Sequence, residues 1–231
     1  MKIRIKFSKQ GHMKFIGHLD TMRYFQKVMR RANVDICYSE GFSPHQKMSF
    51  AAPLGVGIVS NGEYFDIEVN STDSSNEMIK RINEANVEGI EVLKYKLLDD
   101  NAKNCMAIIA GADYTALGLN KLLTKDDLVV YLSQPEIVVL KKTKKSEKEL
   151  DIRPFIYKLS LEEKDEIFMQ LAAGSSNNTK PELVMEAFAA FMEIPYENLK
   201  FMIHRCELYA DTGSDEARNL VSLEDLGEEI E

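Results

Sequence analysis

The sequence has few cysteines, and none of them has the spacing of metal ligands. Cys37, Cys105 and Cys206 lie far apart, and no CxxC or CxxxCxxC pattern occurs. This spacing argues against a zinc knuckle or a cysteine-held iron–sulfur cluster within the chain. We therefore expect three reduced, mostly buried thiols and no bound cofactor.

The sequence also lacks a long apolar run. No stretch reaches the roughly 18 apolar residues that a membrane helix needs. The N-terminal segment MKIRIKFSK alternates apolar and basic residues, which is typical of a half-buried strand with a basic outer face and not of a signal peptide. The expected compartment is the cytoplasm.

Charge is distributed unevenly along the chain. The 231 residues have a formal net charge of −8. Residues 1–50 carry ten lysines and arginines against three acids, whereas residues 211–231 carry eight acids and one arginine. Because salt screens charges beyond roughly 10 Å, the local excess governs the attraction of a polyanion. The basic N-terminal part is therefore a candidate surface for a polyanion.

The order of the expected elements indicates an α+β fold. The first half has the order strand, helix, strand, strand, helix, strand, which is the βαββαβ pattern of a ferredoxin-like domain. The second half repeats this order with an extra strand. We predict tandem ferredoxin-like domains with antiparallel sheets at residues 1–98 and 104–210, followed by an acidic, mobile tail at 211–231.

Local signals predict several individual elements. Val34–Tyr38 and Glu63–Val69 have the pattern of strands, and Asn61-Gly62 has that of a hairpin turn. In the second half, Cys105–Ala112 is expected to be a strand. A helix is expected over residues 120–132 with Thr124 as a cap, and a further helix is expected to begin at Lys180-Pro181-Glu182 and to end near Met192.

A helix over 19–32 carries the strongest basic pattern. Its apolar residues recur at spacings of three and four, which predicts a buried stripe of Leu19, Met22, Phe25, Met29 and Ala32. Its basic residues share the other side, and these are Arg23, Lys27, Arg30 and Arg31. Such a row is either a solvated face or a surface for a polyanion.

The loop that follows this helix combines aromatic rings with cations. Bases of unpaired RNA stack on rings while their phosphates meet cations. The candidate binding residues in the loop are Tyr38, Gly41, Phe42, Ser43, His45 and Lys47. The alternative interpretation is that Phe42 and Phe50 fill the core.

Three of the four histidines lie in the same N-terminal stretch. His12, His18 and His45, together with Asp20, are the candidate catalytic residues, because imidazole and carboxylate groups can perform acid–base cleavage of RNA near neutral pH. They can equally contact a ligand or be structural. No HxH or HExxH pattern occurs, so we expect no metal site.

Two features of the second half are also candidates for binding. Lys141–Lys148 is a lysine-rich hairpin tip, which is either solvated or a second contact to a polyanion. Asp151 and Arg153 are two residues apart on an expected strand and so share a face. Arg153 is therefore a further candidate for binding RNA or a partner, with a structural ion pair as the alternative.

Longer motifs resemble one known family. FSKxGxxxFxGHLDxMRxxxxxxRRA, YSEGFSPHxKxSFAxPLGxGxxSxGEYxDIE and DIRPxI resemble the radical SAM-linked proteins of unknown function, the DUF2344 group, over nearly the whole chain. The positions that match the family's pattern are Gly11, His18, Asp20, Arg23, Arg31, Ser39, Gly41, Phe42, Pro44, Ser49, Pro53, Gly55, Glu63, Asp66, Asp151 and Arg153.

The resemblance implies an accessory role in RNA modification, RNA processing or ribosome biogenesis. Its implied partners are a radical SAM enzyme and ribonuclease G, and it supplies no catalytic residues. The chain lacks the cysteine triad of a radical enzyme, so it resembles the linked partner.

Three hypotheses stay open. They are a non-catalytic module that binds ribosomal or transfer RNA, a metal-independent endoribonuclease that uses a histidine, and a subunit that only docks to a partner protein. Tandem ferredoxin-like domains also resemble the CRISPR repeat endoribonucleases, which is an analogy of fold alone.

Overall fold

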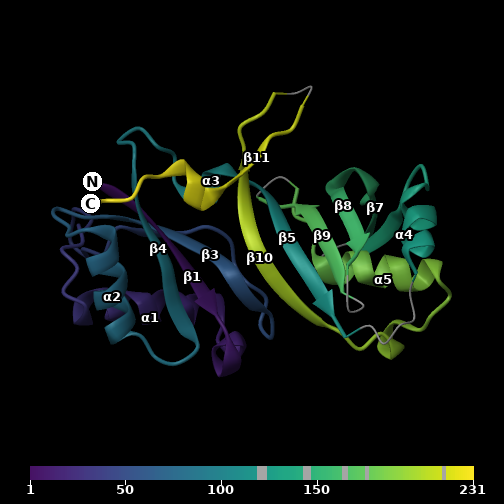
Figure 1. The fold of residues 1–231 in the computed structure, drawn as a ribbon, viewed down its shortest axis with the longest axis horizontal. Helices are drawn as coiled ribbons and strands as arrows, with labels where there is room; N and C mark the ends of the chain where they lie inside the picture. Colours follow the sequence, from purple (N-terminus) through teal and green to yellow (C-terminus); the bar gives the residue numbers. More distant parts are fainter. Residues whose placement is uncertain (119–123, 143–146, 163–165, 175–176, 215–216) are drawn as a thin grey trace. The chain divides into compact units, whose positions relative to one another are not determined.

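The computed structural model describes all residues except 119–123, 143–146, 163–165, 175–176 and 215–216. The chain divides into two compact units. Unit 1 comprises Met1–Ala110 with Glu207–Glu231, and unit 2 comprises Gly111–Cys206. Both ends of the chain therefore belong to unit 1 (Figure 1).

A nine-stranded sheet is the main feature of the fold. Its strand order is β4-β1-β3-β10-β5-β9-β8, with β2 paired to β3 and β11 paired to β10, and β6 and β7 form a separate hairpin. The strands are β1 (Lys2–Lys9), β2 (Met48–Phe50), β3 (Val59–Glu68), β4 (Ile90–Leu98), β5 (Ile109–Leu117), β6 (Val138–Lys142), β7 (Glu147–Asp151), β8 (Ile156–Leu161), β9 (Ile167–Ala172), β10 (Met202–Asp211) and β11 (Leu220–Ser222). The α+β class is confirmed, whereas two tandem ferredoxin-like units are not shown, since strands from both halves of the chain belong to one sheet.

In unit 1, β1 lies between β3 and β4 and pairs antiparallel with both. The helices α1 (His18–Arg31) and α2 (Ser75–Ala85) bury one face each against the sheet. Phe25 of α1 contacts Phe7 of β1 and Phe65 of β3 with ring centroids 4.6 Å apart in both cases. Edge-to-face and tilted ring pairs of this kind stabilise a core beyond their buried area.

Three local expectations for residues 19–69 of unit 1 are wrong. Asn61-Gly62 lies inside β3 and is no hairpin turn, because pairing with β1 continues through Lys9 opposite Ser60. Val34–Tyr38 forms only isolated bridges, Ile36 to Val69 and Tyr38 to Gln46. Leu19 is 66% exposed, so it does not belong to the buried stripe of α1.

The C-terminal segment packs against unit 1 over its described residues, although its acidic composition predicted a mobile tail. Leu223, in the 3-10 helix η4 (Leu223–Leu226), is fully buried. Glu228 pairs with Leu97 of β4, and the backbone N–H of Ile230 donates to the Ser75 hydroxyl at 2.9 Å. The segment therefore adds buried surface to the unit that contains the N-terminus.

Unit 2 agrees with the expected elements in part. Thr124 caps α4 (Lys125–Leu132), and Pro181 begins α5 (Pro181–Phe191). The expected strand at Cys105–Ala112 is instead a short helix of unit 1, α3 (Cys105–Ile108), followed by β5. Most of the lysine-rich hairpin tip, at 143–146, lies outside the described residues.

The remaining short elements are the 3-10 helices η1 (Gly11–Phe15), η2 (Arg153–Phe155) and η3 (Tyr196–Asn198). In the part of the chain that the structure describes, no helix is long and apolar enough to cross a membrane.

Candidate nucleic-acid-binding surface

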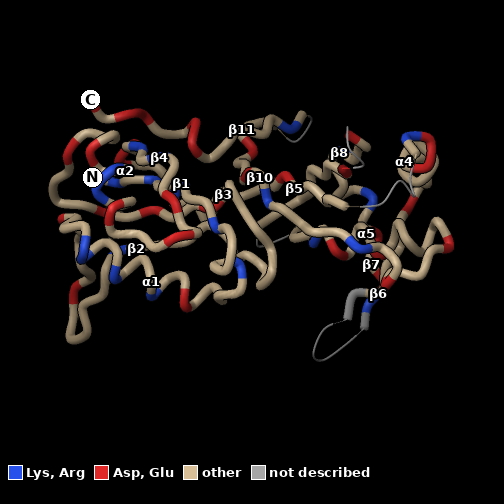
Figure 2. Tube along the Cα trace, turned by 60° about the horizontal axis from the view of Figure 1, so that its bottom comes forward, with Lys and Arg blue, Asp and Glu red and all other residues tan. Residues whose placement is uncertain are grey.

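The helix α1 presents its basic residues to solvent. Its buried side consists of Thr21, Phe25, Val28 and Met29, which places the row of basic side chains on the opposite side of the helix. All four members of this row are exposed, and they are Arg23, Lys27, Arg30 and Arg31. We call these four residues the basic row; Figure 2 marks the lysines and arginines of the described residues in blue.

The charges of the basic row are largely unneutralised. Asp20 accepts a hydrogen bond from Arg23 at 3.3 Å, and both side chains are more than 60% exposed. An exposed pair of this kind contributes little to stability. Among the described residues, Lys27 and Arg30 form no ion pair within 4 Å. The row therefore retains positive charge for an external anion.

The loop Cys37–Lys47 lies beside α1 and is held in a closed conformation. The backbone N–H of Ser39 donates to the His45 carbonyl at 2.8 Å, and the Ser39 hydroxyl lies 2.8 Å from Nδ1 of His45. Gln46 is buried and donates from its side chain to the carbonyl of Gln26 in α1. The loop is thus fixed to the helix that carries the basic row.

The aromatic side chains of this loop are exposed. Phe42 is fully exposed at the loop tip and Tyr38 is 48% exposed, so neither fills the core. Phe50, by contrast, is buried and stacks on Phe65 at 4.9 Å. The alternative interpretation as a core residue therefore holds for Phe50 and fails for Phe42. Gly41 has a φ of +108°, a conformation that glycine adopts without strain.

The candidate histidines have different surroundings. His12 is exposed in η1. His18, at the start of α1, packs edge-on against Phe50 at 5.7 Å and lines a small cavity with Lys9 and Glu63. His45 lines another pocket, on the side of the loop with Lys47. The described geometry therefore does not bring His18 and His45 into one pocket.

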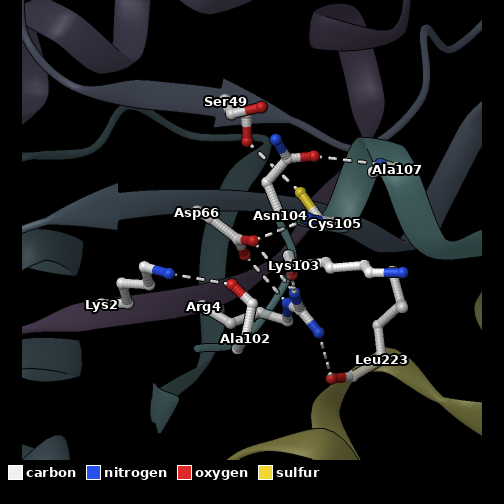
Figure 3. A network of polar contacts seen from close by, with 10 residues as sticks. All are labelled: Lys2, Arg4, Ser49, Asp66, Ala102, Lys103, Asn104, Cys105, Ala107 and Leu223. Atoms are coloured by element: carbon white, nitrogen blue, oxygen red, sulfur yellow. Dashed lines mark hydrogen bonds and ion pairs between the residues drawn. The ribbon is translucent and has the colours of Figure 1, made fainter. Parts of the chain in front are cut away.

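On the sheet face opposite α1, a buried ion pair joins β1 and β3 of unit 1. Arg4 donates from Nε and Nη2 to the two carboxylate oxygens of Asp66, at 2.9 Å each (Figure 3). Asp66 Oδ2 also accepts the backbone N–H of Cys105 at 2.7 Å, and Arg4 donates to the carbonyl of Leu223 at 3.3 Å. Four chain segments meet at this one guanidinium–carboxylate pair.

Protonation in this network follows from burial and hydrogen bonding. Burial would lower the pKa of Arg4, but its hydrogen bonds to Asp66 raise the pKa above the ordinary value, so the guanidinium stays charged. Burial is the main effect that raises the pKa of the Cys105 thiol, and the nearby Asp66 charge raises it further. The thiol also donates to the Ser49 carbonyl at 3.3 Å. Cys105 is therefore held as a neutral thiol without nucleophilic character.

The basic outer face expected for β1 is covered. Arg4 is 1% exposed, and Lys6 donates to Glu207 and Glu224 at 2.6 and 2.7 Å. Burial would lower the pKa of Lys6, but these hydrogen bonds raise it above its ordinary value. The alternation of residues in β1 predicted that these side chains share a face. It could not predict that acidic segments from elsewhere in the chain cover this face.

Arg153 has a local structural contact in unit 2. Its Nε donates to the carbonyl of Leu132 at the end of α4, at 2.9 Å, and its backbone N–H donates to Asp151. Asp151 also accepts the backbone N–H of Ile137 at 2.8 Å. These contacts account for the Asp151 and Arg153 spacing, and a binding role for Arg153 stays a prediction.

Unit 1 also exposes apolar side chains close to the basic row. Phe15, Leu19 and Val56 are each 60–66% exposed. Their segments are adjacent, since the backbone N–H of Gly57 donates to the carbonyl of Lys14 at 2.8 Å. We call these three residues the apolar patch. Sequence reasoning missed it because Leu19 fits the buried helical period.

Across the described ranges, no group of three or more histidine, cysteine, aspartate or glutamate residues is placed to hold a metal ion. The protein is an α+β protein whose unit 1 exposes a basic helix and a loop with aromatic side chains. The chain belongs to the family described as "Uncharacterized protein conserved in bacteria (DUF2344)", whose model matches residues 2–181.

No curated protein matches the chain. Among solved structures, a chain of the "Crystal Structure of a Cbf5-Nop10-Gar1 Complex" is similar with a TM-score of 0.47 and 11% sequence identity. The match covers 89% of this chain and 48% of that chain, so the chain spans about half the length of the structure it matches. At this TM-score the similarity carries no argument about function.

Proposed function

We propose that the protein is a non-catalytic RNA-binding module that presents ribosomal or transfer RNA to a partner enzyme. The observation that carries this proposal is the basic row, whose exposed cations include Lys27 and Arg30 without an ion pair among the described residues. Exposed cations along one helix suit phosphates, which supply most of the affinity in RNA binding.

The loop beside the basic row supports single-stranded RNA as the target. Tyr38 and Phe42 are exposed, and an exposed ring offers a stacking platform for an unpaired base. Gly41, Ser43, His45 and Lys47 are exposed around these rings. Phosphates on α1 and bases on the loop would together favour an unpaired strand over a duplex.

The test is RNA binding by the Arg23→Glu/Arg30→Glu variant, measured by fluorescence anisotropy over a range of salt concentrations. We expect affinity to fall at least about tenfold, and the slope of log K against log salt to become shallower by roughly 0.7 for each lost phosphate contact. The matched control is Lys80→Glu/Lys200→Glu, which makes the same charge change at two exposed positions outside α1.

Unchanged affinity in the α1 variant would refute this surface. An equal loss in both double variants would show that only net charge matters. If affinity falls only in the α1 variant, crosslinking and sequencing of RNA bound to the protein in its native host would identify the RNA, again with the α1 variant as control.

The apolar patch supports docking to a partner protein as a second candidate function. Exposed apolar residues that lie together are typical of protein interfaces. The implied partners are a radical SAM enzyme and ribonuclease G. Co-purification of either enzyme should survive nuclease treatment and be lost in Leu19→Asp, while Asp20→Asn, an exposed neighbour, should retain it.

The endoribonuclease alternative has a direct test. Structured RNAs incubated with the wild type in chelator should remain intact, because His18 and His45 lie in different surroundings and His12 is exposed in η1. Cleavage by the wild type that is absent in His18→Ala would instead establish an acid–base site at His18.

A further inference from the structure

A pocket of about 430 Å³ opens on unit 1, within the range of about 300–1,000 Å³ that is typical of small-molecule sites. It contains cations, carboxylates and neutral polar groups. The lining residues used below are Lys2, His45, Lys47, Ser49, Glu68 and Asn104.

The pocket lies on the sheet face opposite α1 and α2. Lys2 is the cross-strand partner of Glu68 and of Leu98, and Ser49 is the partner of Asp66. Cross-strand partners share a face, whereas Ile3, the neighbour of Lys2, belongs to the core packed under α1 and α2. The pocket is therefore built on the outer face, and the segment 102–104 adds a further wall.

The walls are held by hydrogen bonds that need no ligand. The Arg4–Asp66 pair fixes one wall, and Asp66 also holds the backbone of Cys105. Lys2 Nζ donates to the carbonyl of Ala102 at 2.9 Å, which ties β1 to the opposite wall (Figure 3). The pocket is thus pre-formed, which lowers the entropy cost of binding.

The polar groups of the pocket suit a small anionic ligand with further polar atoms. Lys47 donates to Glu68 at 2.6 Å and Asp66 is matched by Arg4, so the charge of Lys2 is left in excess. His45 uses Nδ1 on Ser39, which leaves Nε2 for a ligand. The lining also contains Ser49 and Asn104. The side-chain oxygen of Asn104 accepts the backbone N–H of Ala107 at the start of α3, so its NH₂ group is the part that can donate to the edge of a planar ring. Buried Leu98 adds apolar surface.

We propose that this pocket binds one nucleoside monophosphate unit, with the phosphate at Lys2 and His45 and the base edge at Ser49 and Asn104. The unit is either a free nucleotide or one nucleotide of an RNA strand. In the second case the inference rests on the proposed function.

The loop connects the pocket with the basic row. Gln46 donates towards α1, and its neighbours His45 and Lys47 line the pocket. Alternate residues of an extended segment point in opposite directions, so the same loop contacts α1 on one side and the pocket on the other. A strand bound along α1 can therefore follow the loop to the pocket.

The first arm of the test uses free ligands. AMP, GMP, CMP, UMP, the matching nucleosides and inorganic phosphate are titrated into the full-length protein and followed by amide NMR shifts. We expect at least one nucleotide to shift the amides of Lys47, Ser49 and Asn104, and to bind tighter than its nucleoside and than phosphate. Ser49→Leu, which fills the pocket, and Lys2→Gln should each weaken binding at least about tenfold.

The control is Lys94→Gln, a half-buried lysine of β4 outside the pocket, which should bind as the wild type does. Its chemical change matches that of Lys2→Gln. Circular dichroism and the NMR spectrum of each variant establish that it is folded before binding is compared.

The second arm uses short single-stranded RNA. Ser49→Leu should weaken RNA binding and make the salt dependence shallower by only the one phosphate held in the pocket, roughly 0.7 in the slope of log K against log salt. Arg23→Glu/Arg30→Glu should reduce this slope further and leave mononucleotide binding intact. Nucleotide binding with no RNA binding would sink the proposed function and retain the pocket for a free nucleotide. RNA binding that Ser49→Leu does not alter, with no shift by any mononucleotide, would overturn the inference.

Discussion

At the scale of single residues, the ion pair of Arg4 with Asp66 shows how burial changes the meaning of a charge. The two side chains are 1% and 10% exposed. Removal of one partner leaves the other charge buried, which costs far more than the net contribution of the intact pair. The positions lie 62 residues apart, so the pair joins distant parts of the chain.

We expect Asp66→Ala to lower the free energy of unfolding by about 3–5 kcal/mol, because the Arg4 guanidinium loses its buried carboxylate. Urea denaturation measures the change. Asp20→Ala removes the exposed partner of Arg23 and should change stability by less than about 1 kcal/mol. Similar losses in both variants would contradict a special role for the buried pair.

A second residue-scale prediction concerns His204 in unit 2. Burial lowers the pKa of this imidazole below its ordinary value of 6.5, against a smaller opposing effect of Glu166. Below pH 6.5 the unfolded chain takes up a proton that folded His204 resists, so the free energy of unfolding falls as the pH falls towards the folded-state pKa. Above pH 6.5 this contribution is fully present.

The measurement is urea denaturation of the wild type and His204→Gln at several pH values between about 5 and 8. The stability of the wild type relative to the variant should decrease towards the acidic end. The exposed His12→Gln serves as the control and should follow the wild type. Parallel pH profiles for the wild type and His204→Gln would contradict the assignment.

At the scale of elements, local signals determine where several helices begin. Thr124 accepts the backbone N–H of Asp127 at 3.3 Å, and Asp127 accepts the backbone N–H of Thr124 at 2.7 Å. This reciprocal capping box satisfies two backbone donors at the start of α4. Because the contact lies within four residues, it could be predicted from sequence.

Thr124→Ala should lower the free energy of unfolding by about 1 kcal/mol, because the first turn of α4 loses its side-chain acceptor. Thermal or urea denaturation checks the value. Thr124→Ser retains the hydroxyl and should stay close to the wild type. A loss with serine as large as that with alanine would show that the methyl group, and not the cap, stabilises the helix.

At the scale of the whole molecule, the C-terminal segment completes unit 1. Leu223 is fully buried, Glu224 binds Lys6, and Glu229 binds Lys96 at 2.9 Å. These contacts bridge more than 100 positions of the chain. The segment is therefore a structural part of the N-terminal unit, although it is acidic and lies at the end of the sequence.

Leu223→Ala should lower the free energy of unfolding by about 2–5 kcal/mol, because it leaves a cavity where a side chain is fully enclosed. Asp225→Ala, at an exposed position in the same 3-10 helix, is the control and should have little effect. Proteolysis should cleave the Leu223→Ala variant near its C-terminus faster than the wild type. Equal stability of both variants would restore the mobile-tail interpretation.

Features that depend on neighbouring residues could be predicted from the sequence. Alternation predicted the N-terminal strand that the structure shows as β1, and periodicity placed the basic row on one side of α1. The motifs indicated the family. These features could be predicted because strand alternation, helix periodicity and capping depend on residues only a few positions apart in the sequence.

Which faces are covered and which side chains are in contact depends on the tertiary structure. Strand pairing kept Asn61-Gly62 inside β3, and the C-terminal segment buried Arg4, whose hydrogen bond to Leu223 spans 219 positions. The pocket joins Lys2, the loop and Asn104, which share no local pattern. Contacts between distant segments depend on strand order and register, and no local period of the sequence contains that information.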